Sequence, residues 1–102
     1  MEVTHLHRSL DLFLASLGTC AGIYVKRFCM ERKISTDAIR IVQEAEPREK
    51  GGLAVIRMTI QVPPDFPEQY KQAVINAANL CTVKKVIQDP PEFQIQVETA
   101  PE

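Results

Sequence analysis

The stretch LDLFLASLGTCAGIYV, residues 10–25, decides the fold. It is apolar almost throughout, with a single charge at Asp11 and two basic residues directly after it. Ser9 and Asp11 favour a helix start and the following cations favour a helix end, so we expect a helix over about residues 9–32. The first two-thirds of this helix are apolar nearly all round, which predicts burial on several sides.

The main apolar stripe of this helix includes a cysteine. The residues at helical spacing along the stripe are Leu10, Phe13, Leu14, Leu17, Ala21, Tyr24 and Phe28. Cys20 lies on the stripe, three residues after Leu17 and four before Tyr24. Cys29 lies half a turn round the helix from Cys20, so the two cannot pair within it. Because its sequence neighbours are charged, we expect Cys29 to be partly exposed.

Two glycines interrupt the same helix. Gly18 and Gly22 are four residues apart, and glycine inside a helix costs up to about 1 kcal/mol relative to alanine. Close approach of another backbone is the usual compensation. That backbone belongs either to the same helix of a second copy or to the second helix of the same chain. The apolar character all round favours the first, an intertwined homodimer.

Composition limits the classes of function. A chain of 102 residues is one small domain, and its net charge of −1 and lack of tryptophan argue against a nucleic-acid partner. Three widely spaced cysteines do not form a secreted disulfide framework and fit a reducing compartment, so we expect a cytoplasmic protein. The apolar run resembles a signal-peptide core, but Asp11 interrupts it and it is short for a membrane span. We therefore expect no membrane partner.

The middle of the chain predicts a β-hairpin. DAIRIVQEAE (37–46) and LAVIRMTIQV (53–62) both alternate apolar and polar residues, as half-buried strands do. PREKGG (47–52), between them, has the composition of a turn.

The last third predicts a second helix and a final strand. The helix starts with Pro67 in its first turn and ends before Asp89. One face of it carries Tyr70, Val74, Ala77, Ala78 and Cys81. EFQIQVE (92–98) then alternates as a strand with Phe93, Ile95 and Val97 inward. The order helix, strand, strand, helix, strand predicts an α+β fold, with an antiparallel sheet packed on a buried central helix.

Cys20 and Cys81 share a property, because each lies on the apolar face of a predicted helix. Both then point toward the same interior. One hypothesis is that they are inert packing residues, since free cysteine behaves as a small hydrophobe. The other is a reactive thiol pair, which requires a lowered pKa. Lys84, just beyond Cys81, is a local cation. His5 and His7 are too isolated to form a metal site, so no metal is expected.

The segments DLFLASLGTCAGIYVKRFCMERK (11–33) and ANLCTVKKVIQDPPEFQIQVE (78–98) resemble the two cysteine motifs of the OsmC/Ohr family of thiol-dependent peroxidases. The resemblance extends over about residues 9–99 and includes the hairpin and the final strand. It implies a single OsmC-like domain over residues 1–102 and an intertwined homodimer with its central helices packed together.

The same resemblance implies a mechanism. Cys20 is the peroxidatic cysteine, which attacks a small, preferably organic, hydroperoxide and becomes a sulfenic acid. Cys81 is the resolving cysteine, and an external dithiol reduces the resulting disulfide without any cofactor. Phe13, Leu17 and Tyr24 are expected to line an apolar pocket for the substrate.

The family also has N-terminal strands that supply an arginine to activate the thiol. No counterpart of them precedes the first helix in this sequence, so we expect a short and divergent member. Arg8 and Lys84 are candidates for stabilising the thiolate instead. The alternative hypothesis is a non-enzymatic dimer of the same fold, with inert cysteines, that binds a small apolar ligand between its subunits.

Overall fold

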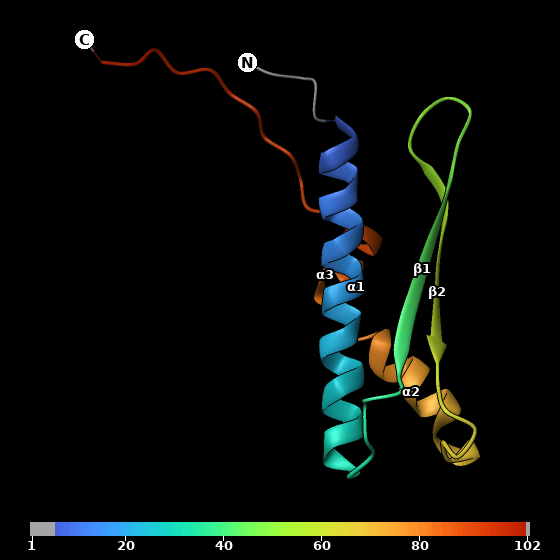
Figure 1. Ribbon diagram of the computed structural model, residues 1–102. Coiled ribbons are helices and arrows are strands. Elements are labelled where there is room, and N and C mark those ends of the chain that lie inside the picture. Colours follow the sequence, from blue (N-terminus) through green and yellow to red (C-terminus); the bar gives the residue numbers. More distant parts are fainter. Residues whose placement is uncertain (1–5, 102) are drawn as a thin grey trace.

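The computed structural model describes residues 6–101, with side chains from residue 9 onward, as an α+β chain built along one long helix (Figure 1). The helices and strands are α1 (Leu6–Glu31), β1 (Arg40–Pro47), β2 (Leu53–Gln61), the 3₁₀ helix η1 (Glu68–Tyr70), α2 (Lys71–Ala78) and α3 (Thr82–Gln88). The hairpin of β1 and β2 runs beside α1, and α1 also contacts α2 and α3.

α1 confirms the predicted first helix, and its end is fixed by main-chain hydrogen bonds. Lys33 takes a left-handed conformation, with φ of 57°. The N–H of Ile34 donates to the carbonyl of Cys29 at 2.9 Å, and the N–H of Lys33 donates to that of Met30 at 3.2 Å. This is a Schellman motif, which satisfies carbonyls at the helix end. Ile34 then packs against the core, so the chain turns back toward the sheet.

Within the part of the chain that the structure describes, one face of α1 is covered. Leu17, Ala21, Val25 and Phe28 are buried on that face. On the opposite face the side chains of Leu12, Ile23 and Met30 remain 72%, 53% and 65% exposed. The hairpin, α2 and α3 together do not enclose the helix, so burial on several sides needs a second copy and stays a prediction.

The core forms around the second half of α1. It joins Val25, Phe28 and Cys29 of α1 to Phe66 and to Val74 and Ala77 of α2. The expected exposure of Cys29 is wrong, since its side chain is 0% exposed. Its charged neighbours in sequence project from other faces of the helix, while Cys29 itself faces the core.

The hairpin is confirmed, in antiparallel register with Ile41 opposite Ile60 and Gln43 opposite Met58. Its turn contains Gly51 and Gly52, both at positive φ (96° and 78°), where glycine is the favoured residue.

One face of the hairpin, which includes Ile41, Gln43 and Met58, is half-buried. Gln43 fastens this face to α1, because its Nε2 donates to the carbonyl of Leu14 at 2.9 Å. On the exposed face Arg57 forms two ion pairs. Its Nη1 lies 3.9 Å from Oε2 of Glu44, and its Nη2 lies 3.7 Å from Oε2 of Glu46.

The predicted second helix is broken into two. The N–H groups of Leu80 and Cys81 donate to carbonyls three residues back, at 3.0 and 3.3 Å, which tightens and ends α2. Cys81 itself is the N-cap residue of α3, with an extended ψ of 120°. It therefore lies at a junction between helices and not on the face of one helix. α3 ends at Gln88, as the following aspartate and prolines predict.

The predicted final strand is not a strand in this structure. Residues 89–101 have no regular secondary structure and extend away from the helices (Figure 1). Phe93, Ile95 and Val97 are 80%, 95% and 97% exposed, where the pattern predicts that they face inward. A strand needs a hydrogen-bonded neighbour, and the described sheet has only β1 and β2.

The glycines of α1 face β1 and not a second helix. A Cβ added at Gly22 would lie 3.8 Å from Cδ1 of Ile41, and one added at Gly18 would lie 3.8 Å from Oε1 of Gln43. Both distances are ordinary van der Waals contacts, so the expected close approach of another backbone is not seen at these positions.

Gly22→Ala should therefore stabilise the protein by about 1 kcal/mol, because alanine favours the helix and gains contact with Ile41. Urea unfolding followed by circular dichroism measures the change. Gly52→Ala is the matched control: with φ of 78° at that position it should destabilise by about 1 kcal/mol. A loss of stability in Gly22→Ala would show that this face packs against another backbone.

Candidate active site

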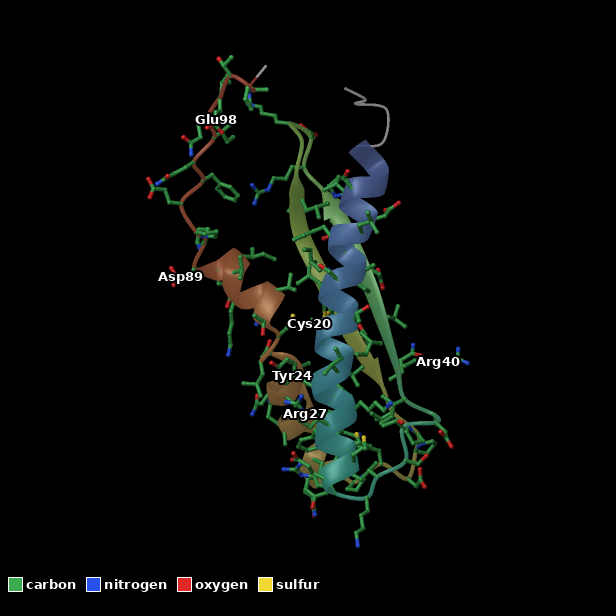
Figure 2. All side chains as sticks on the ribbon, turned by 90° about the vertical axis from the view of Figure 1, so that its left-hand side faces the viewer. Cys20, Tyr24, Arg27, Arg40, Asp89 and Glu98 are labelled. Carbon is green, nitrogen blue, oxygen red and sulfur yellow. The ribbon has the colours of Figure 1, made fainter. Side chains whose placement is uncertain are left out.

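The fold brings Cys20 and Cys81 together, although they come from separate elements. Cys20 is half-buried on α1, and Cys81 is 2% exposed at the junction of α2 and α3. The two thiols lie close enough for each to shift the pKa of the other. The Cys81 thiol donates to the carbonyl oxygen of Leu17 at 3.9 Å, one turn before Cys20 on α1. Figure 2 shows Cys20 on the side of α1 that faces the α2–α3 region.

Main-chain amides of α3 stabilise the thiolate of Cys20. The backbone N–H of Val83 makes the largest contribution to lowering the pKa of Cys20 below its usual value. The hydrogen bond from Cys81 comes next, partial burial opposes both, and the N–H of Thr82 adds to the lowering. Hydrogen bonds to the charged form favour ionisation, so Cys20 has the character of a nucleophile.

Cys81 has the opposite tendency. Burial raises the pKa of the Cys81 thiol, and its hydrogen bond and charge interaction with Cys20 raise it further. The N–H groups of Lys84 and Val83 oppose this only in part. The Cys81 thiol therefore loses its proton at a higher pH than the Cys20 thiol does.

Cys29, the third cysteine, is separate from this pair. Burial raises the pKa of Cys29, and the nearby charge of Arg32 opposes the effect. A neutral thiol enclosed in the core is a packing residue.

The two cations expected near the thiolate are placed as follows. The ammonium of Lys84 donates to Oδ1 of Asn79 at 2.5 Å, and the pKa of Cys20 is lowered by amides and Cys81 and not by this ammonium. Arg8 lies outside the residues whose side chains are described. A stabilising role for either residue stays a prediction.

An apolar cavity of about 750 Å³ opens between α1, the half-buried face of the hairpin, α2 and α3. Leu17 and Cys81 both line it. Its other apolar lining residues are Ala21, Ile41, Ile56, Met58, Ile60, Val62, Val74, Ile75, Ala78 and Ile87. Within the described chain, Phe13 and Tyr24 are not part of this lining, so contact between them and a substrate stays a prediction.

The amide donors are the part of the site that sequence reasoning missed. Every residue has a backbone N–H, so residue type carries no signal for the donors at Thr82 and Val83. The one usable signal is Asn79, since asparagine favours helix ends over helix interiors. A break there would have placed Cys81 at the start of a new helix.

Neither a metal site nor a membrane span is indicated strongly. Among residues 6–101, no group of three or more His, Cys, Asp or Glu side chains is placed to hold a metal ion. The part of α1 from Ser9 to Glu31 is long and apolar enough to cross a membrane by length and composition alone. Core helices of soluble proteins meet the same criterion, so this is weak support for a membrane span.

The chain thus has an α+β fold with one thiol on its long helix and a second thiol beside it at a helix junction. The family model described as OsmC-like protein matches residues 7–96, and the chain belongs to this family. The family is commonly associated with defence against peroxides and other stress. No curated protein and no solved structure matches the chain.

The pKa directions predict the order in which the cysteines react. Iodoacetamide should alkylate Cys20 at a lower pH than Cys81 or Cys29, because only the thiolate is alkylated. Peptide mass spectrometry after short labelling from neutral to alkaline pH follows each cysteine separately. In the protein unfolded by urea, the pH profiles of alkylation of the three cysteines should converge, because the folded environment that separates them is lost. A shared profile in the folded protein would contradict the assignment of Cys20 as the nucleophile.

Proposed function

We propose that this protein is a cytoplasmic thiol-dependent peroxidase that reduces organic hydroperoxides, with Cys20 as the peroxidatic and Cys81 as the resolving cysteine. The observation that supports it is a pair of neighbouring thiols that influence each other and whose pKa values are displaced in opposite directions. A peroxidatic cysteine has to be ionised, and a resolving cysteine has to stay close and reduced until the first has reacted.

The reaction needs only the two sulfurs, a hydroperoxide and a dithiol. The Cys20 thiolate attacks the terminal peroxide oxygen, an S–O bond forms as the O–O bond breaks, and the leaving alkoxide takes a proton from water to become an alcohol. Cys20 is thereby oxidised by two electrons to a sulfenic acid. The Cys81 thiol displaces water from it to form a disulfide, and an external dithiol returns both thiols by exchange while it is itself oxidised.

The cavity supports the preference for an organic substrate. It is apolar over most of its lining, and its wall includes Cys81 and Leu17 but not Cys20, which lies next to Cys81. Binding an alkyl group there removes apolar surface from water, which favours binding. Hydrogen peroxide has no apolar surface to bury, so the cavity does not favour its binding.

We also propose a homodimer, from the surface that the chain leaves uncovered. Its accessible surface is 8681 Å², whereas a compact monomer of this mass has about 5,800 Å². Its radius of gyration is 18.0 Å, against about 13 Å for a compact domain of 100 residues. The exposed face of α1, with Leu12, Ile23 and Met30, is the surface that a second copy would cover.

Sedimentation equilibrium should then give about 23 kDa, twice the chain mass of 11.5 kDa. Ile23→Glu should shift the protein toward the monomer, because a charge would be buried in the interface. Val42→Glu, on the exposed face of the hairpin, is the matched control and should leave the mass unchanged. A monomer in the unmodified protein would contradict the dimer.

The second candidate function is ligand binding without catalysis. A cavity of about 750 Å³ lies in the range of small-molecule sites. In this case the two thiols would be inert parts of its wall and surroundings.

One equivalent of cumene hydroperoxide added to the reduced protein distinguishes the two functions. Peroxidase chemistry predicts a Cys20–Cys81 disulfide within seconds, seen by peptide mass spectrometry. Cys20→Ser should abolish it. Cys81→Ser should stop at the Cys20 sulfenic acid, which a dimedone probe traps.

Cys29→Ala is the matched control, since it removes a thiol that is enclosed in the core. Its disulfide yield should equal that of the unmodified protein. Thiols that remain reduced for an hour in the folded protein would reject the peroxidase and leave ligand binding as the function.

A further inference from the structure

Tyr24 lies one turn beyond Cys20 on α1, where α3 meets the thiol (Figure 2). Its hydroxyl is 3.5 Å from Oγ1 of Thr82, the first residue of α3. The backbone N–H of Thr82 is one of the donors to the Cys20 sulfur. Thr82 is therefore linked to Tyr24 through its side chain and to Cys20 through its main chain.

Other contacts also hold the start of α3. Its N-cap residue, Cys81, is buried and reaches the carbonyl of Leu17 on α1, and Val83 is half-buried. Thr82 itself is exposed, and its side chain reaches α1 through Tyr24. Hydrogen bonds weaken steeply with distance and angle, so a side chain that ties the start of α3 to α1 controls how well the amides reach Cys20.

The ring of Tyr24 is itself held in place. The guanidinium carbon of Arg27 lies 5.4 Å from the ring centroid, a cation–π distance that favours one ring orientation. The other titratable groups at the start of α3 are Cys81 and Lys84, and the ammonium of Lys84 is bound to Asn79. The hydroxyl of Tyr24 thus joins α1 to Thr82.

We propose that Tyr24 is a positioning residue for Cys20: through Thr82 it holds the first amides of α3 against the thiol sulfur. It acts on the thiol from the side and does not contact the peroxide, which differs from the pocket-lining role predicted from the sequence. The proposal rests on the proposed function for its biological meaning, but the ionisation of Cys20 tests it directly, with no peroxide present.

The experiment compares Tyr24→Phe with the unmodified protein by the pH profile of Cys20 alkylation, followed by peptide mass spectrometry. Loss of one hydrogen bond should slow Cys20 alkylation at pH 7 by about threefold and move its profile to higher pH. Tyr70→Phe is the matched control, because Tyr70 packs edge-on against Phe28, and its profile should be unchanged. Thr82→Val removes the other partner of this hydrogen bond, the Thr82 hydroxyl, and keeps the backbone N–H of residue 82.

The double variant Tyr24→Phe/Thr82→Val should slow Cys20 no more than either single variant, since both remove the same hydrogen bond. An unchanged Cys20 profile in Tyr24→Phe, or effects that simply add, would overturn the proposal. If the proposed function is wrong and the role of Tyr24 is right, the results differ from these. The unmodified protein would form no disulfide with cumene hydroperoxide, but the Cys20 alkylation profile would still shift in Tyr24→Phe.

Discussion

The packing of α2 and α3 on a single face of α1 is the contact on which the other features depend. Ala21 and Val25 are buried on that face of α1, and Val25 belongs to the same core cluster as Val74 and Ala77 of α2. Ala77 is small, so α2 can lie close to α1, and its end then falls beside Leu17 and Cys20. The position of Cys81 follows from this contact, since the chain has to turn where α2 ends.

The helix break gives the site its chemistry. An unbroken helix over residues 71–88 would keep the amides of Thr82 and Val83 in its own main-chain hydrogen bonds. Because α2 ends at Ala78 and α3 begins at Thr82, these amides are the free donors of a new first turn. They lower the pKa of Cys20. The backbone at this junction therefore favours the Cys20 thiolate.

The sequence predicts correctly those segments whose structure follows from their own residues. It does not predict the features that depend on which other segments pack against them. The long helix and the hairpin follow from periodicity and turn residues, which are properties of short segments. The break at residues 79–81 was missed because Asn79 is its single local signal, and the apolar face of the predicted helix continues through Cys81. The environment of Cys29 was mispredicted because the charges beside it in sequence lie on other faces of α1. Segment 92–98 has the pattern of a strand, but pairing also needs an edge to pair with.

That segment also has a consequence for solubility. Phe93, Ile95 and Val97 form a short run of high β-propensity in full contact with water, which is the kind of segment that nucleates aggregation. The run is enclosed by Glu92 and Glu98, two glutamines alternate with its apolar side chains, and Pro90 and Pro91 precede it. Charges and prolines beside an exposed strand act as gatekeepers, because stacking copies in register would bring like charges together. The composition around the segment thus limits indiscriminate self-association while the strand pattern itself is kept.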